Sequence, residues 1–522
     1  MAEKLTHWAD QTAFRIIKQK GEKDVYSCAA GITPSGTIHA GNFREIITVE
    51  LIVRALKSMD KNTRFIYSWD DYDVFRKVPK NMPNQEELQK FLRMPITDTP
   101  DTFDCKHSSF AEHNEKMLEK YLPTLGINPE FIKQSIKYKN CDYANEINTC
   151  LKETDKIKDV LNQYRKEPLA NDWLPVSIFC DKCKKDTIEK IDYKEDFIVS
   201  YKCECGHSEE LDIRKKGIIK LNWRIDWPMR WHYENLDCEP AGKDHFAAGG
   251  SRQSGVEIQK AIWDEEAPIG FMYEWIGIKG GGQFSSSSGN VVTLKELLEI
   301  YEPEIIRFMF AGTRPNSEFS ISFDLDVIKV YEDFDKLERI YFGKEEISEK
   351  KAAKQKRIYE LSCVNEIPKE ISYQPSFRHL TNILQIHSLN LEKTKEVYKD
   401  ELKNDDDIKR FELRAICAIN WINKYAPEDF KFSIVEKSNI KLDDKQKAIF
   451  KDLIDQLNSK DWTAKDLHQE FYDIARRHEV EPKEIFNLSY QILIAKEKGP
   501  QLASFIIAIG KERVADIFNG LI

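Results

Sequence analysis

Short apolar runs and longer periodic runs of apolar residues alternate near the start of the chain. Residues 25–30 form a compact, largely apolar run, which is typical of a buried strand. Residues 43–59 repeat apolar side chains at helical spacing, and residues 63–68 form a second strand-like run that ends in an acidic cluster. Strand, loop, helix and strand in this order predict a βαβ unit of a parallel sheet. Ligands bind such sheets at the carboxyl ends of the strands, so we expect the functional site there.

The rest of the pattern predicts further domains. The middle of the chain is polar, rich in cysteine and less periodic, which indicates an insertion, and strand-like signals return at residues 218–230 and 245–250. From residue 329 onward the signals are nearly all helical. We therefore expect an α/β protein with these segments: the first half of a parallel-sheet domain (1–94), an insertion (95–217), the second half of the sheet domain (218–300), a connecting helical region (301–345) and an α-helical domain (346–522).

Composition and charge restrict the class of protein. Of 522 residues, 41% are hydrophobic and 32% charged, which is ordinary for a folded chain and excludes a disordered one. No apolar run approaches the roughly 18 residues that span a bilayer, and the start lacks a secretory pattern, so we expect a cytoplasmic protein without a membrane. The net charge of -9 argues against a histone-like basic binder. A local basic face for nucleic acid remains compatible with it.

The 11 cysteines include a group with the spacing of a metal site. In a reducing cytoplasm, clustered cysteines are interpreted first as metal ligands. Two pairs separated by a short hydrophilic hairpin predict a tetrahedral Zn²⁺ site: Cys180, Cys183, Cys203 and Cys205. The second pair is tightly spaced, so His207 is an alternative ligand to one of its members; four unbound cysteines are the other interpretation.

A weaker cluster lies upstream, and all four of its side chains are possible zinc ligands: Asp101, Cys105, His107 and His113. The rival interpretation is a polar surface loop. Both clusters would be structural sites, because protein ligands fill every position and leave none for water.

Two loops have the composition of phosphate-binding segments. Pro34, Ser35 and Gly36 begin a loop that ends in His39, Gly41 and Asn42 at the start of the predicted helix. Glycines let the backbone approach a ligand, the helix N-terminus presents N–H groups to an anion, and His39 and Asn42 add donors. This chemistry suits nucleotidyl transfer, where stabilising charge on the α-phosphate is the main task. A glycine-rich turn that merely caps a helix is the alternative.

The second loop runs from Lys279 through three glycines to four consecutive serines. It is rich in N–H and hydroxyl donors suited to closing over a pyrophosphate. A flexible linker has the same composition. Because packed elements are predicted on both sides, we interpret it as a functional loop inside a domain.

In this order, the two loops resemble the paired signatures of class I aminoacyl-tRNA synthetases. Residues 39–42 resemble the "HIGH" motif, and Gln283, Phe284, Ser285, Ser286 and Ser287 stand where "KMSKS" belongs. Residues 27–44, 223–231 and 242–245 narrow the resemblance to the class I lysyl type, which is related to the glutamyl type. The resemblance implies a Rossmann-like catalytic domain, zinc in the insertion, and an all-α anticodon-binding domain. Residues 498–502 and 509–514 resemble the last helices of that anticodon-binding domain.

The chain departs from the second signature at its lysines. Gln283 and Ser286 replace the two lysines that hold the transition-state phosphates in the family. Serine hydroxyls and N–H groups can bond the same oxygens but bring no positive charge. Our hypothesis is that Lys279 or Mg²⁺ supplies this charge.

A lysine pocket needs a carboxylate for the ammonium group and aromatic walls for the aliphatic stem. Asp226 stands between Trp223 and Trp227, and an unpaired buried carboxylate would be costly. Core packing is the alternative for the tryptophans. Because Arg224 and Arg230 could supply an inward cation, a pocket for glutamate instead of lysine remains the other interpretation. Further predicted lysine-binding residues are Asp244, His245 and Tyr273, and the resemblance adds Gly31 and Thr33 as contacts of the α-amino group.

The resemblance implies ligation of lysine to tRNA(Lys) by way of a lysyl-adenylate, with ATP and L-lysine as substrates and AMP and diphosphate as products. We expect Mg²⁺ with the nucleotide, structural Zn²⁺, and a monomer. A glutamyl or glutaminyl synthetase, or a catalytically weakened tRNA-binding paralogue, are the alternatives.

Overall fold

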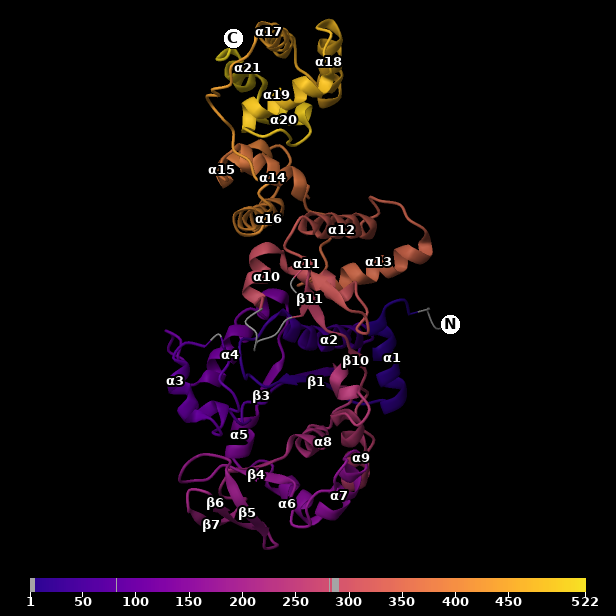
Figure 1. Cartoon of the computed structure of the whole chain (residues 1–522). Helices are drawn as coiled ribbons and strands as arrows, with labels where there is room; N and C mark the ends of the chain where they lie inside the picture. The colour runs from indigo at the N-terminus through magenta and orange to yellow at the C-terminus, as the bar shows by residue number, and fades with distance from the viewer. Residues whose placement is uncertain (1–4, 81, 281, 284–290) are drawn as a thin grey trace. The chain divides into compact units, whose positions relative to one another are not determined.

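The structure is a computed structural model that describes residues 5–80, 82–280, 282–283 and 291–522 (Figure 1). The chain divides into two compact units. The first contains Met1–Leu298, Pro303–Ile321 and Leu337–Lys369, and the second Glu299–Glu302, Ser322–Lys336 and Glu370–Ile522. The boundaries expected at 301 and 346 differ from the limits of these units, because the chain passes between the units more than once.

Three parallel strands form the centre of the first unit. Strands β1 (Tyr26–Ile32), β2 (Thr63–Trp69) and β3 (Glu130–Lys133) hydrogen-bond in the order β1-β2-β3, and both pairs are parallel. Helix α2 (Ala40–Lys57) connects β1 to β2 and buries most of its side chains, and α1 (Trp8–Lys20) packs on it. The predicted βαβ unit and the parallel-sheet fold are confirmed.

The sheet continues on the other side of β1. Cys238 forms parallel bridges to Cys28 and to Ile269, and β9 (Ala241–Gly242) pairs in parallel with β10 (Met272–Tyr273). These segments run in the same direction as β1 and β2, so their carboxyl ends meet at the same edge of the sheet.

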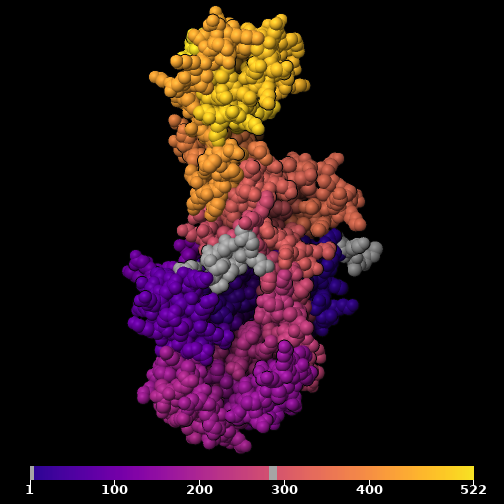
Figure 2. Space-filling model, in the orientation of Figure 1, coloured from indigo at the N-terminus to yellow at the C-terminus, as the bar shows by residue number. Residues whose placement is uncertain are grey.

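The stretch expected to be one insertion, 95–217, is interrupted by the sheet. β3 lies inside it, yet pairs with β2 over Ile66–Trp69. We correct the prediction on this point: four residues of β3 were too few to show a strand pattern amid polar neighbours. The part of the chain between β2 and α8 is coloured violet to magenta in Figure 2. Besides β3, its elements are α3 (Gln85–Leu88), η1 (Gln89–Phe91), η2 (Ile96–Asp98), α4 (Phe110–Glu119), η3 (Pro123–Leu125), α5 (Gln134–Lys139), α6 (Ala144–Lys152), α7 (Thr154–Asn162), β4 (Val176–Ile178), β5 (Ile188–Tyr193), β6 (Ile198–Cys203), β7 (Ser208–Asp212) and β8 (Ile219–Leu221).

The strand-like signal at 218–230 is only partly correct. β8 ends at Leu221, and Trp223–Tyr233 form helix α8. Its tryptophans recur every fourth position, at 223, 227 and 231, which is a helical period; we gave too much weight to the β propensity of aromatic residues. The signal at 245–250 is also wrong, since a 3-10 turn, η4 (Lys243–Phe246), precedes α9 (Ser251–Trp263).

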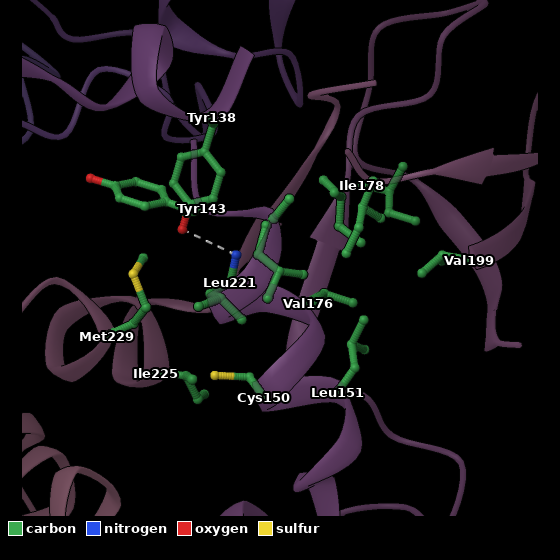
Figure 3. Close-up of a cluster of buried hydrophobic side chains, with 14 of the residues drawn as sticks. Tyr138, Tyr143, Cys150, Leu151, Val176, Ile178, Val199, Leu221, Ile225 and Met229 are labelled. Carbon is green, nitrogen blue, oxygen red and sulfur yellow. Dashed lines mark hydrogen bonds between the residues drawn. The ribbon is translucent and has the colours of Figure 1, made fainter. Parts of the chain in front are cut away.

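The insertion has a hydrophobic core of its own (Figure 3). Val176 and Ile178 of β4, Leu221 of β8 and Ile225 of α8 are buried together with residues of α6 and α7. Tyr138 closes this core, and its hydroxyl oxygen accepts the backbone N–H of Leu221 at 3.3 Å. α8 is therefore held between the insertion and the sheet.

A further small sheet lies in the first unit. It has the order β12-β11-β13, in which β11 pairs antiparallel with β12 and parallel with β13. Arg307 is fully buried and donates to Glu50 of α2 at 2.7 Å and to two backbone carbonyls, which ties α11 to α2. The elements are α10 (Leu294–Ile300), α11 (Pro303–Ala311), α13 (Glu349–Ser362), β11 (Ile276–Ile278), β12 (Gly282–Gln283) and β13 (Phe319–Ile321).

Helices make up all the regular structure described in the second unit, which confirms the prediction of a helical C-terminal part. Arg414 is fully buried there and pairs with Asp335 at 2.9 Å and Glu302 at 2.5 Å. No helix in the described part of the chain could span a bilayer. The helices are α12 (Asp326–Tyr341), which continues into the first unit, α14 (Phe377–Ile386), α15 (Leu391–Val397), α16 (Asp405–Lys424), α17 (Asp444–Ser459), α18 (Ala464–Arg477), α19 (Pro482–Ile494), α20 (Leu502–Ile509) and α21 (Lys511–Asn519).

Candidate active site

A cavity of about 790 Å³ lies in the first unit at the carboxyl ends of β1 and β2. The N-terminus of α2, the N-terminus of α8 and the segments at β9 and β10 form its other walls. Nine of the residues proposed from the sequence line it: Gly31, Thr33, His39, Gly41, Asn42, Trp223, Asp244, His245 and Tyr273. The structure thus brings together residues from four separate parts of the chain.

His39 and Asn42 build the first turn of α2. His39 is the N-cap residue, and its Nδ1 accepts the backbone N–H of Gly41 at 3.1 Å. Asn42 Oδ1 in turn accepts the backbone N–H of His39 at 3.1 Å, which completes a capping box. Burial lowers the pKa of His39 to about 4, so its ring is neutral at pH 7. Because Nδ1 acts as an acceptor, the ring proton is on Nε2, where it can be donated to an oxyanion.

The neighbouring loop residues lie less close to the cavity. Pro34 and Gly36 are buried, and the Pro34 carbonyl accepts the side-chain amide of Asn114 at 3.3 Å. Ser35 is exposed and lines a smaller adjoining cavity. The hydrogen bond from Asn114 thus anchors this loop to α4.

The second predicted loop is only partly described. Lys279 follows β11 and is exposed, and its backbone N–H donates to the carbonyl of Ile321 at 3.0 Å. Gln283 belongs to β12, which pairs with β11. Phe284, Ser285, Ser286 and Ser287 lie outside the described residues. The proposed phosphate contacts of this loop stay predictions.

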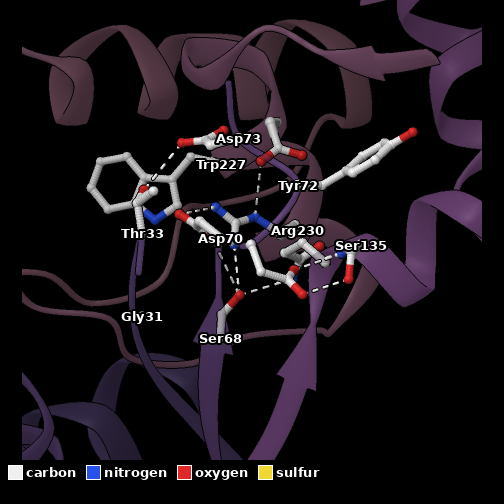
Figure 4. A network of polar contacts seen from close by, with 12 residues as sticks. Gly31, Thr33, Ser68, Asp70, Tyr72, Asp73, Ser135, Trp227 and Arg230 are labelled. Carbon is white, nitrogen blue, oxygen red and sulfur yellow. Dashed lines mark hydrogen bonds and ion pairs between the residues drawn. The ribbon is translucent and has the colours of Figure 1, made fainter. Parts of the chain in front are cut away.

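Asp226 is not in the cavity wall, which corrects its proposed role. It is buried, accepts a hydrogen bond from the hydroxyl of Tyr138, and lies 3.3 Å from Nε of Arg230. Arg230 also pairs with Asp70 at 2.6 Å and donates to Ser68 at 2.8 Å (Figure 4). The carboxylate of Asp226 is therefore paired with Tyr138 and Arg230 inside the protein, where it helps to hold Arg230 in place behind the cavity wall.

Carboxylates outnumber cations in the cavity wall, with Asp and Glu at five positions and Lys and Arg at two. Three of the five are already paired: Asp70 with Arg230, Asp73 with Lys220 at 2.6 Å, and Glu274 with Lys243 at 2.6 Å. Although burial opposes it, Lys220 lowers the pKa of Asp73, which also accepts the hydroxyl of Thr33 at 3.1 Å. These pairs fix the rim of the cavity.

The other two carboxylates, those of Glu45 and Asp244, have no Lys or Arg nitrogen within 4.0 Å among the described residues. Glu45 accepts the backbone N–H of Gly31 at 3.4 Å and the hydroxyl of Tyr273. Burial, with repulsion from nearby carboxylates, raises the pKa of Glu45 well above its usual range, although the Gly31 N–H opposes this. Two carboxyl groups thus face the cavity without a cation among the described residues.

Four cysteine sulfurs gather in the insertion as the spacing predicts. The Sγ atoms of Cys180 and Cys205 are 3.7 Å apart, and those of Cys183 and Cys203 are 3.6 Å apart. Sulfurs at the corners of a tetrahedron around Zn²⁺, with Zn–S near 2.3 Å, would be about 3.8 Å apart. The donor set therefore fits zinc. His207 lies beside Glu209 instead, with Nε2 at 3.6 Å from the carboxylate.

The upstream cluster is also assembled. Cys105 Sγ lies 2.6 Å from Asp101 Oδ2 and 3.0 Å from Nδ1 of both His107 and His113. One ligand atom from each residue lies within 4.8 Å of all the others. A carboxylate, a thiol and two imidazoles that converge on one point are the donor types of a zinc site.

Comparisons with known proteins agree with this arrangement. Residues 6–365 match the family described as tRNA synthetases class I (K), and residues 418–516 match an anticodon binding domain. This chain belongs to the class I (K) tRNA synthetase family. Similar relatives, each named lysine--tRNA ligase, occur in Borrelia garinii subsp. bavariensis (52% identical), Borreliella burgdorferi (51%) and Treponema pallidum (46%). The matches cover 98–99% of this chain and of each relative.

In this synthetase, sequence reasoning missed several residues of the cavity wall. The most informative is Glu45, a charged residue of the helical run 43–56, which also contains Arg44, Glu50 and Arg54. A charge within a buried helical face was a signal that could have been followed. Asp70, Asp73 and Lys220 were missed because their roles depend on pairing across long sequence separations.

Proposed function

We propose that this class I synthetase activates L-lysine with ATP to lysyl-adenylate and diphosphate, then transfers the lysyl group to tRNA(Lys). The single observation that carries this proposal is identity of up to 52% with lysine--tRNA ligases over 99% of both chains. The cavity supports it independently, because a diammonium substrate suits a wall with two unpaired carboxylates.

Glu45 and Asp244 are the proposed ammonium acceptors, one for each amino group of lysine. Both lie beside Tyr273, whose aromatic ring with that of Trp223 offers apolar wall to the aliphatic stem. A glutamate substrate fits less well. Arg230 is already held by Asp70, and Arg224 donates to the Gly249 carbonyl and to Ser254.

The N-terminus of α2 is the proposed phosphate side of the cavity. Neutral His39 donates from Nε2, Asn42 offers its side-chain amide, and the helix N-terminus adds positive potential. We further propose that Lys279, or Mg²⁺ bound with the nucleotide, supplies the charge that the missing signature lysines would bring. Loop residues 283–287 would contact the same phosphates.

The chemistry needs no protein nucleophile. A lysine carboxylate oxygen forms a bond to the α-phosphorus while the bond to diphosphate breaks in line. His39 stabilises the negative charge that develops on the α-phosphate oxygens. In the second step a ribose hydroxyl of tRNA attacks the lysyl carbonyl, and AMP leaves.

The two cysteine-containing clusters are proposed as structural zinc sites. Cys180, Cys183, Cys203 and Cys205 would hold one ion, and the cluster of Asp101, Cys105, His107 and His113 the other. When bound, zinc would fix the folds of the insertion by cross-linking its turns. A monomeric enzyme in the cytoplasm remains the prediction from the sequence.

Amino-acid-dependent exchange of ATP and labelled diphosphate, run for the twenty amino acids with and without tRNA, tests the function. We expect lysine alone to support exchange. Exchange with glutamate only in the presence of tRNA would replace lysine by glutamate as substrate, and silence with all twenty would indicate a paralogue without activity.

A further inference from the structure

Three polar side chains of the cavity wall are joined in a hydrogen-bonded chain. Lys220 of β8 donates from Nζ to Asp73 Oδ1 at 2.6 Å. Asp73 Oδ2 accepts the hydroxyl of Thr33 at 3.1 Å, a contact that can be followed in Figure 4. All three residues line the active-site cavity. The chain therefore runs from a cation, through a carboxylate, to a hydroxyl that directly follows β1.

The ion pair at the start of this chain is buried. Lys220 is 8% exposed, and its Nζ also donates to the backbone carbonyl of Tyr72 at 3.4 Å. Burial works against the charge of Asp73, but the Lys220 ammonium and the hydrogen bonds from Lys220 and Thr33 lower the pKa of this carboxyl. Burial likewise works against the charge of Lys220, but the Asp73 carboxylate raises its pKa. The pair is therefore a carboxylate and an ammonium at neutral pH.

An ionised carboxylate fixes the direction of the hydrogen bond from Thr33. A carboxylate has no hydrogen to donate, so the hydroxyl hydrogen of Thr33 must be directed at Asp73. The side chain of Thr33 makes no other hydrogen bond among the described residues. Its oxygen therefore offers the cavity lone pairs and no hydrogen.

Thr33 lies at the part of the cavity where the α-amino group of lysine is expected. The lysine carboxylate must reach the phosphate held at the first turn of α2, and Glu45 lies one helical turn beyond Gly41 in that helix. Glu45 also accepts the backbone N–H of Gly31, which is two residues before Thr33. The amino group next to the reacting carboxylate is the α-amino group. This places it beside Thr33 and Glu45, with the stem extending toward Asp244.

We propose that Asp73 and Lys220 are positioning residues that make Thr33 a hydrogen-bond acceptor for the α-ammonium group of the substrate. This inference rests on the proposed function, because it takes lysine as the occupant of the cavity. An ammonium group has three hydrogens to donate, and Glu45 and Thr33 accept two of them. A 2-oxo group at the same place has only lone pairs and would be repelled by the Thr33 oxygen. The chain thus selects a substrate with a free α-amino group.

Asp73 itself is a poor site for the substrate ammonium. Each of its two oxygens already accepts a hydrogen bond, one from Lys220 and one from Thr33. Lys220 also balances its charge at 2.6 Å. A second cation beside this pair would meet repulsion from the Lys220 ammonium. The carboxylate therefore acts on the substrate through Thr33.

Asp73→Asn tests the proposal because it keeps the shape of the side chain and reverses the hydrogen bond. The Lys220 ammonium needs an acceptor, so the amide oxygen should face Nζ and the amide NH₂ should face Thr33. The hydroxyl hydrogen of Thr33 then turns to the cavity. We expect the KM for lysine in ATP–diphosphate exchange to rise about tenfold or more, with kcat and the KM for ATP within about threefold of wild type.

Glu274→Gln is the matched control, because this carboxylate also lines the cavity and is paired with a lysine, Lys243, at 2.6 Å. It should leave the KM for lysine within about threefold of wild type. Lys220→Arg, which keeps the cation, should remain closer to wild type than Lys220→Met. Circular dichroism and urea unfolding establish that each variant is folded.

A substrate analogue separates the proposed role from a general disturbance of the pocket. 6-Aminohexanoate is lysine without the α-amino group, so its inhibition constant should change by less than about threefold in Asp73→Asn. Thr33→Val removes the hydroxyl and nearly keeps the shape. It should raise the KM for lysine by itself, and adding Asp73→Asn to it should raise the KM by less than about threefold further, because the effect passes through the Thr33 hydroxyl.

The proposal is overturned if folded Asp73→Asn keeps the wild-type KM for lysine, or if it weakens 6-aminohexanoate as much as lysine. It is also overturned if Asp73→Asn acts as strongly in the Thr33→Val background as in the wild type. Should Asp73→Asn not fold, a wild-type KM for lysine in Thr33→Val would overturn it. Failure of lysine to support exchange in the wild-type enzyme would instead overturn the proposed function, so the two failures are distinguishable.

Discussion

Replacing Glu45 by glutamine removes one of the two unpaired carboxylates in the cavity wall and keeps the size of the side chain. The amide can still accept the Gly31 N–H, so the fold around β1 should persist. A charge-assisted hydrogen bond in a partly buried site is worth about 1.5–3 kcal/mol. Among the described residues no Lys or Arg nitrogen lies within 4.0 Å of this carboxylate, so nearly all of that loss should appear in substrate binding. We expect kcat/KM for lysine to fall about 10- to 150-fold.

The assay is ATP–diphosphate exchange, measured first at varied lysine and saturating ATP, and then at varied ATP and saturating lysine. The loss should appear in the KM for lysine, with the KM for ATP unchanged. Glu274→Gln is the matched control, because this carboxylate also lines the cavity but is already paired with Lys243. A KM for lysine within about threefold of wild type in Glu45→Gln would refute the reasoning.

The pH dependence supplies an independent check of the same residue. Since burial raises the pKa of Glu45, part of the free enzyme carries a protonated carboxyl that must ionise before it accepts an ammonium group. Lysine affinity should therefore rise with pH, up to the raised pKa of the free enzyme. The glutamine variant should lose this part of the pH profile. An identical profile in both proteins would exclude Glu45 as the titrating group.

His39→Ala should slow lysine-dependent exchange about 100-fold with an unchanged circular dichroism spectrum. His39→Asn keeps an N-cap acceptor and should be as slow. A wild-type rate in either variant would exclude the proposed oxyanion role. Gly31→Ala should destabilise the fold by about 1–3 kcal/mol in urea unfolding, because its Cβ would meet Ser68 O at 2.6 Å; unchanged stability would show that the strands can separate there. Metal analysis should find about two zinc ions per chain, falling to one in Cys183→Ser or His113→Ala, whereas no zinc at all would eliminate both sites.

Much of the framework could be predicted because its signals are local. The strand, loop and helix of residues 25–59 each occupy a short continuous segment, so their periods are visible without partners. The two candidate metal clusters also follow from spacing, since side chains on tight turns are brought together by the turns themselves. β3 was missed because four residues give no measurable period, and its place in the sheet depends on β2.

The βαβ unit, the helical C-terminal part and the grouping of the candidate metal ligands could be read from the sequence, because their signals are local. Which carboxylates line the cavity depends instead on the tertiary structure. Asp226 looked like a ligand, yet Tyr138, 88 positions away, and Arg230 satisfy it, while Glu45 of α2 has no cation beside it among the described residues. A buried carboxylate must find partners, and whether these are protein groups or a substrate depends on contacts between distant segments.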